Sequence, residues 1–84
     1  MDAAVIEAAI LRLVAERGVE KSISPSDVAI TLGEPWQSHL KAVRAAAVTL
    51  AKAGRLQVLR KGKPVEDFGA LRGVIRLRAV RGMS

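Results

Sequence analysis

The basic side chains in the second half of the chain are the residues with the clearest chemical potential. Their type and spacing could bind a polyanion. Residues 41–84 contain eleven Lys and Arg side chains and two acidic ones, a net charge of +9. Residues 1–40 contain three basic and six acidic side chains, a net charge of −3. This uneven distribution attracts polyanions, of which nucleic acid is the commonest in a cell. A small domain can also be basic for solubility alone.

The first group of candidate residues lies on a predicted helix over about 36–53, whose outward face carries no acidic residue. Gln and Arg can read base edges with two hydrogen bonds, whereas Lys and Ser mostly hold phosphate. The candidates on this helix are Gln37, Ser38, Lys41, Arg44 and Lys52. A solvated helix face is the alternative interpretation. Arg44 is also placed for a salt bridge to Asp27 or Glu34.

The second group lies in the long loop of a predicted hairpin that follows this helix. Its candidate cations are Arg60, Lys61, Lys63 and Arg72. Gly62 and Gly73 allow the backbone to approach a phosphate closely, and Pro64 limits the entropy lost when the loop becomes ordered. Against a binding role, Glu66 and Asp67 place two negative charges in the same loop. A basic, exposed hairpin tip without a ligand is the alternative interpretation.

Three further arginines alternate along the last predicted strand and the tail: Arg76, Arg78 and Arg81. They could line a basic face, but outward Arg is also an ordinary protection of an edge strand against pairing with another chain. We prefer this second interpretation. Trp36 is expected to anchor the core at the start of the long helix, and His39 is expected to be structural.

The sequence contains no arrangement of residues that is typical of catalysis or of metal binding. It has no Cys and one His, which excludes disulfides, thiolate chemistry and Cys-based zinc fingers. Helix capping explains Ser24, Ser26 and Asp27, and the adjacent side chains of Glu66 and Asp67 usually point apart instead of holding magnesium. We therefore expect no enzyme activity, no catalytic or metal-binding residue and no cofactor.

The first group of candidates depends on a helix, and the sequence predicts two further helices that pack with it. Residues 2–17 have apolar positions at helical spacing, with Asp2 as N-cap and Gly18 at the C-terminal end. The stretch Ser24-Pro25-Ser26-Asp27 predicts a second helix start, because Ser24 can cap, Pro fits the first helical position and Asp27 can close a capping box. This short helix is expected to end at about residue 32.

After Gly54 the hydrophobic period changes to two, which predicts strands. Residues 55–60 and 74–78 have the right lengths to pair as a hairpin, with a loop of roughly twelve residues between them. The composition of Lys61-Gly62-Lys63-Pro64 predicts a turn. One short extended segment is expected earlier in the chain, with Ile23 pointing inward.

The order of these elements is that of a winged helix-turn-helix, an α+β and mainly α fold of three helices and a short β-hairpin wing. A chain of 84 residues has room for one small domain. We predict a single domain over residues 1–84, with helices at about 2–17, 25–32 and 36–53 and the hairpin at about 55–79. An RNA-binding ferredoxin-like domain would need aromatic side chains on its strands, and the chain has one Phe and no Tyr.

Spaced motifs also cover nearly the whole chain, from about residue 6 to residue 78. They are Ser24-Pro25-Ser26-Asp27-Val28-Ala29, Trp36, Val43-Arg44-Ala45-Ala46, Lys61-Gly62-Lys63-Pro64-Val65 and Gly73-Val74-Ile75-Arg76-Leu77-Arg78. On these motifs the chain resembles the bacterial family catalogued as domain of unknown function 3253. The resemblance implies a winged-helix-like fold and implies no particular activity.

The sequence thus predicts a domain that binds double-stranded DNA, with the third helix in the major groove and the basic wing on phosphate. The alternative is a protein-interaction module that binds an acidic protein partner or forms a homodimer. The longest apolar stretch, residues 3–14, is interrupted by Glu7 and Arg12 and is too short to span a bilayer. Because the first residues lack the positive region of a signal peptide, we expect no membrane partner and a cytoplasmic location, at the nucleoid if DNA is bound.

Overall fold

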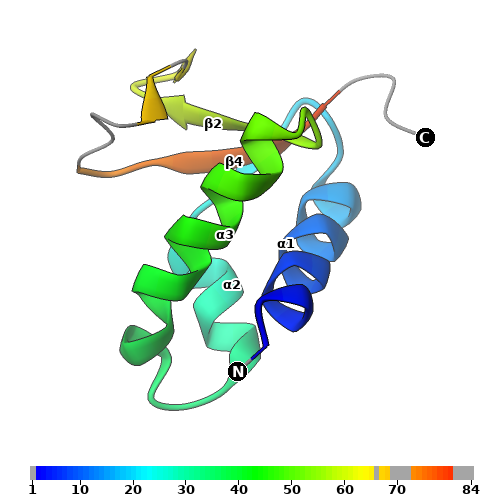
Figure 1. Cartoon of the computed structure of the whole chain (residues 1–84). Coiled ribbons are helices and arrows are strands. Elements are labelled where there is room, and N and C mark those ends of the chain that lie inside the picture. Colours follow the sequence, from blue (N-terminus) through cyan, green and yellow to red (C-terminus); the bar gives the residue numbers. More distant parts are fainter. Residues whose placement is uncertain (1, 66, 69–72, 81–84) are drawn as a thin grey trace.

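The computed structural model describes residues 2–65, 67–68 and 73–80 of the chain. Its elements are α1 (Ala3–Arg17), β1 (Ser22–Ile23), α2 (Pro25–Leu32), the 3₁₀ helix η1 (Trp36–His39), α3 (Leu40–Lys52), β2 (Leu56–Arg60), β3 (Lys63–Pro64) and β4 (Arg76–Ala79). The three α-helices form a bundle, and a four-stranded antiparallel sheet lies across one end of it (Figure 1). This architecture is α+β and mainly α, as predicted, and it is compatible with a winged-helix-like fold.

The first two helices begin where the sequence predicts, because side chains cap them. Asp2 Oδ1 accepts a hydrogen bond from the backbone N–H of Ala4 at 3.0 Å. At α2, Ser24 Oγ accepts from the N–H of Asp27 at 3.2 Å, and Asp27 Oδ2 accepts from the N–H of Ser24 at 2.9 Å. These bonds satisfy donors that the first turn of a helix leaves unpaired.

The third helix starts differently from the prediction. Residues 36–53 are predicted as one helix, whereas the structure has a 3₁₀ turn over Trp36–His39 before the α-helix begins at Leu40. Such turns are frequent at helix N-termini. The N-cap residue Pro35 supplies no side-chain hydrogen bond here, but Glu34 Oε2 accepts one from the N–H of Trp36 at 3.4 Å. Trp36 packs half-buried against the core, in the anchoring position expected of it.

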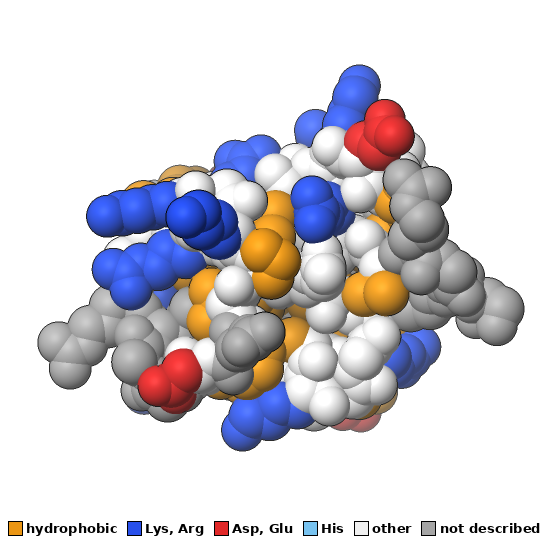
Figure 2. Space-filling view, turned by 90° about the horizontal axis from the view of Figure 1, so that it is seen from above, with side chains coloured by type: hydrophobic (Ala, Val, Ile, Leu, Met, Phe, Trp, Pro, Cys, Tyr) orange, Lys and Arg blue, Asp and Glu red, His pale blue; other side chains and the backbone are white. Residues whose placement is uncertain are grey.

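The strands form a sheet in the order β1-β4-β2-β3. Strand β4 pairs with β1 through Ser22 and Arg78 and with β2 through Gln57 and Arg78. It is therefore a central strand, and the prediction that its arginines protect a sheet edge is wrong. The two-residue strand β1 pairs with the edge of β4 that we predicted to be exposed. The face of the sheet that is turned away from the helices looks toward the viewer in Figure 2.

The segment between β2 and β4 contains its own tight hairpin instead of one long loop. The chain turns from β2 into β3 through Lys61 and Gly62, whose φ angles of 54° and 80° are both positive. Two positive φ angles are typical of the type I′ turn that joins adjacent strands. Residues Lys63–Pro64, predicted as part of a turn, form strand β3, and the pairing continues as the N–H of Val65 donates to the carbonyl of Val58 at 2.8 Å.

The core lies between the helices and the inner face of the sheet. Leu56 and Val58 of β2 and Leu77 of β4 alternate with outward residues and are buried, as the period of two predicts. The largest fully buried side chains are Ile10, Ile23, Leu50, Ile75, Leu77, Val14, Val28, Val43 and Val58. In the described part of the chain, no helix combines the length and apolar character that crossing a bilayer requires.

Candidate nucleic-acid interface

The hairpin tip, defined as residues Arg60, Lys61, Gly62 and Lys63, brings together three of the predicted cations. Arg60 and Lys63 are direct cross-strand partners, and Lys61 occupies the first position of the turn. All three side chains are exposed and make no hydrogen bond or ion pair with another described residue. Like charges directly opposite each other in an antiparallel pair are destabilising. The fold therefore holds an uncompensated positive charge at this tip.

The exposed face of α3 carries two more of the predicted cations. Lys41 and Lys52 both point away from the core, on the opposite side of the helix from Val43 and Leu50. At a rise of 1.5 Å per residue, the two lysines lie about 16 Å apart along the helix axis. Small exposed residues such as Ala45 separate them. The C-terminal end of α3, where Lys52 is the last residue, lies beside the sheet, whereas the N-terminal end of α3, which includes Lys41, lies at the opposite end of the bundle (Figure 1).

An acidic residue borders this face of α3, which the helix sequence alone does not show. Glu7 of α1 lines a shallow groove together with Ala42, Ala45 and Thr49 of α3. The spacing in α1 places Glu7 off the apolar stripe but does not identify the helix beside it. A phosphate backbone that approaches α3 from the side of α1 would therefore meet a carboxylate.

Arg44 borders the same face of α3 on the side away from Glu7, and it links α3 to the segment before β4. Its Nη1 donates a hydrogen bond to the backbone carbonyl of Gly73 at 3.0 Å. The salt bridge to Asp27 or Glu34 considered above does not form between these described residues. Arg44 is half-buried, so the structure assigns it a link between α3 and the segment before β4 instead of a freely exposed contact.

The remaining candidates lie apart from the hairpin tip. Gln37 and Ser38 belong to η1, at the end of the bundle away from the sheet (Figure 1). Gln37 is exposed, whereas Ser38 Oγ donates to the carbonyl of Pro35 at 2.8 Å and so serves the local turn. Arg72, the fourth loop candidate, lies outside the described residues, as do Glu66 and Arg81.

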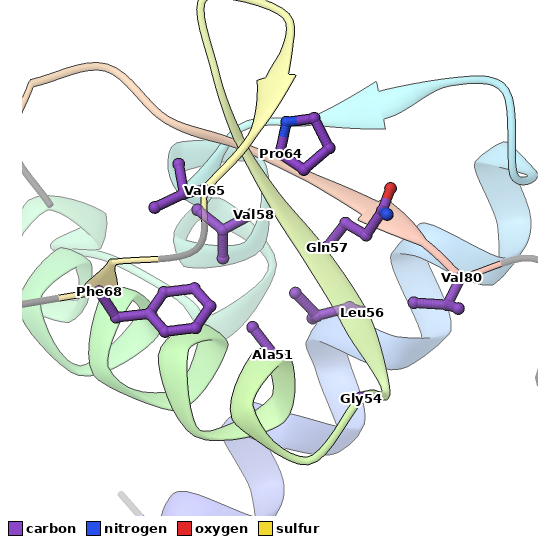
Figure 3. A pocket seen from close by; sticks show the side chains of 9 residues that line it. All are labelled: Ala51, Gly54, Leu56, Gln57, Val58, Pro64, Val65, Phe68 and Val80. Atoms are coloured by element: carbon purple, nitrogen blue, oxygen red, sulfur yellow. The ribbon is translucent and has the colours of Figure 1, made fainter.

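The segment after β3 folds back onto α3 and fixes the base of the wing. The ring of Phe68 points toward Ala51 at the end of α3 and toward Val58 of β2 (Figure 3). With Val65 it lines an open, mainly apolar hollow of about 320 Å³. The sequence analysis gives Phe68 no role in the core, because the segment around it has no hydrophobic period. Its packing shows that the hairpin is anchored on the helix.

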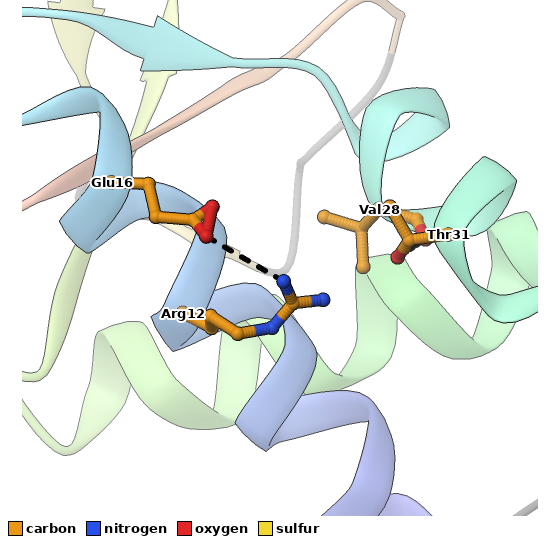
Figure 4. A network of polar contacts seen from close by, with 4 residues as sticks. All are labelled: Arg12, Glu16, Val28 and Thr31. Carbon is orange, nitrogen blue, oxygen red and sulfur yellow. Dashed lines mark hydrogen bonds and ion pairs between the residues drawn. The ribbon is translucent and has the colours of Figure 1, made fainter.

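Several acidic side chains in the first half of the chain form their contacts within that half. Arg12 and Glu16 form an ion pair of 3.6 Å on α1 (Figure 4). Thr31, which lies across from them on α2, donates its Oγ1 to the carbonyl of Val28 at 2.7 Å. The carboxylates of Asp2 and Asp27 cap helices. None of these acids neutralises a described cation of the hairpin tip or of the exposed face of α3.

The chain was compared with protein families and with curated proteins. A family model described as "Protein of unknown function (DUF3253)" matches residues 3–80, which include every helix and strand from α1 to β4. No curated protein matches the chain.

Proposed function

The chain belongs to the family of proteins of unknown function DUF3253, and we propose that this member binds double-stranded DNA through its hairpin tip and the exposed face of α3. The hairpin tip would hold phosphate, and α3 would approach a groove. We place this non-catalytic function in the cytoplasm, at the nucleoid of a bacterial cell.

The observation that carries the proposal is the arrangement of charge at the hairpin tip. Lys61 adopts a positive φ of 54°, a conformation that costs an L-residue other than glycine roughly 1–2 kcal/mol. Type I′ turns favour Asn, Asp or Gly at this position. The neighbouring pair of Arg60 and Lys63 adds repulsion across the strands. A bound polyanion would neutralise the repulsion, and binding it would be a reason for a lysine to occupy a turn position that suits other residues better.

The exposed face of α3 supplies a surface that a DNA groove can approach. Ala45 and Thr49, which lie between Lys41 and Lys52, have short side chains that would not obstruct an approaching groove. The two lysines can then reach phosphates on either side, since most protein–DNA hydrogen bonds go to the backbone. The link from Arg44 to Gly73 holds the segment before β4 beside this helix.

The test is a titration of a labelled duplex with the full chain at several salt concentrations, followed by fluorescence anisotropy. Five described cations contribute: Lys41, Lys52, Arg60, Lys61 and Lys63. If each displaces one counterion, the slope of log K against log salt is about −4.5. A flat salt response, or no binding at low salt, would contradict the proposal.

Charge-reversed variants show whether the helix and the hairpin act together. Lys63→Glu and Lys41→Glu should each weaken binding several-fold and make the salt slope shallower by about 1. Lys21→Glu is the matched control, because Lys21 is exposed and precedes β1, the strand at the opposite edge of the sheet from β3. Equal loss of affinity in the control would mean that only net charge matters and would exclude a defined interface.

A further inference from the structure

The outer face of the sheet, defined by the outward residues of its strands, carries arginines that the proposed interface does not use. These residues are Ser22, Gln57, Leu59, Pro64, Arg76 and Arg78, of which Leu59 is buried and Gln57 and Arg78 are half-buried. We propose that this outer face is a second phosphate-binding surface, which takes the backbone of a second duplex segment and lets one domain bridge two segments of DNA. The inference rests on the proposed function.

Both arginines are held in fixed orientations by neutral partners. Arg76 donates from Nε to Ser22 Oγ and from Nη2 to the Ser22 carbonyl, each at 2.9 Å. Arg78 donates from Nε and from Nη2 to Gln57 Oε1, at 3.2 and 2.6 Å. Because serine and glutamine carry no charge, these bonds orient the guanidinium groups without neutralising them. Each group keeps its Nη1 donors for a ligand.

The described outward residues of the outer face carry positive charge and no negative charge. None of its six defining residues is acidic. Figure 2 shows Lys and Arg side chains spread over this end of the molecule, with acidic side chains at its margins. Arg78 and Gln57 also line an open hollow of about 320 Å³, beside Val19 and Val80. There is thus room for a phosphate group next to an oriented guanidinium.

The position of the arginines removes their simplest structural explanation. Outward Arg is common on edge strands, where it discourages pairing with other chains. Strand β4 is paired on both sides at Leu77 and Arg78, so Arg78 does not protect an exposed edge, and the side chain of Arg76 bonds to the neighbouring strand β1. Neutral side chains could also form the cross-strand hydrogen bonds. What the arginines add is charge in the forked geometry that binds phosphate with two hydrogen bonds.

The chemistry of this face favours a duplex backbone over an unpaired strand. Arg76 and Arg78 are two residues apart on one strand, so their Cα atoms lie about 7 Å from each other. Unpaired bases are held by stacking on aromatic rings, and none of the outward residues defining this face is aromatic. The helices, including α3, pack on the inner face (Figure 1). A duplex along α3 would therefore leave the outer face free for another segment.

The closing experiment adds acids beside the arginines instead of removing the arginines. The variant Gln57→Glu with Ser22→Asp should keep both hydrogen-bonded pairs as ion pairs while it cancels the charge of the face. The assay measures how much labelled duplex the full chain captures on an immobilised duplex, alongside the affinity for a single duplex. We expect bridging to fall by about tenfold, the effect of losing two phosphate contacts, with little change in single-duplex affinity.

The control variant is Ala8→Glu with Ala15→Glu, which adds the same charge at exposed positions of α1 and should bridge like the unchanged protein. Thermal melting of both variants verifies folding. Single-duplex binding without any bridging overturns this inference but not the proposed function, whereas the absence of all duplex binding overturns both. Bridging that persists in the Gln57→Glu, Ser22→Asp variant assigns bridging to self-association and overturns the inference. If this variant loses bridging and single-duplex affinity equally, the outer face is part of the first interface, and the inference of a second surface is overturned.

Discussion

The hairpin tip and the outer face of the sheet lie in the same small sheet, and both are rich in cations. At the tip, Arg60, Lys61 and Lys63 have no side-chain partner among the described residues. On the outer face, Arg76 and Arg78 each make two hydrogen bonds to a neighbouring strand. The cations of the tip oppose folding through repulsion, whereas those of the outer face support it.

This difference determines which measurement reveals the role of each region. Removing a cation from the tip should change binding and leave stability intact or improved. Removing one from the outer face should change stability first, because Arg76 links β4 to the two-residue edge strand β1 through two hydrogen bonds to Ser22. A loss of DNA binding after an arginine deletion in the outer face would thus mix two causes. Introducing acids there avoids this problem.

The largest expected difference between the two regions is in the free energy of unfolding. Arg76→Ala removes two hydrogen bonds to Ser22, each contributing about 0.5–1.5 kcal/mol, so stability should fall by about 1–3 kcal/mol. Arg60→Ala, at an exposed tip position, should stay within about 0.5 kcal/mol of the unchanged protein. Urea denaturation measures both. Equal losses in the two variants would contradict the distinction between the regions.

A second and smaller difference separates Arg44 from the exposed lysines of α3. Arg44→Ala removes the hydrogen bond to the Gly73 carbonyl and should lower stability by about 1 kcal/mol. Lys41→Ala should leave stability unchanged and make the salt slope of DNA binding shallower by about 1. Urea denaturation and the duplex titration applied to both variants check this. A stable Arg44→Ala variant with weakened DNA binding would return Arg44 to the interface.

The helices follow from the sequence because their signals are local. Ser24, Pro25 and Asp27 are neighbours in the chain, so their capping bonds need no information from elsewhere. The position of β4 is different. The sequence predicts the short extended segment with Ile23 pointing inward, but it does not show which strand this segment pairs with, because Ser22 pairs with Arg78 across most of the length of the chain. The exposed edge predicted for β4 is wrong for this reason.

The residues of the candidate interface also differ in whether their contacts are local in the sequence. Arg60, Lys61 and Lys63 are close in sequence, so any turn at Gly62 brings their charges together. Contacts between distant segments are not visible in spacing. Helical periodicity gives the angle of Arg44 around α3 but not the carbonyl of Gly73 that it meets. Likewise, helical periodicity places Glu7 off the apolar stripe of α1, but it does not show that α3 lies beside Glu7.

The smallest expected effect is the most specific one, because binding and stability should change in opposite directions. Lys63→Glu places a carboxylate directly opposite Arg60 and converts a repulsive cross-strand pair into an attractive one. Such pairs contribute about 0.2–1 kcal/mol, so the variant should be more stable by an amount in this range while its affinity for duplex falls. Urea denaturation at low salt measures the gain, which added salt should reduce by screening. The double variant Arg60→Glu with Lys63→Glu restores repulsion with the opposite sign and should lose the gain in stability. If Lys63→Glu instead destabilised the protein, the tip would not be under electrostatic strain, and the main reason for assigning it a polyanionic ligand would be gone.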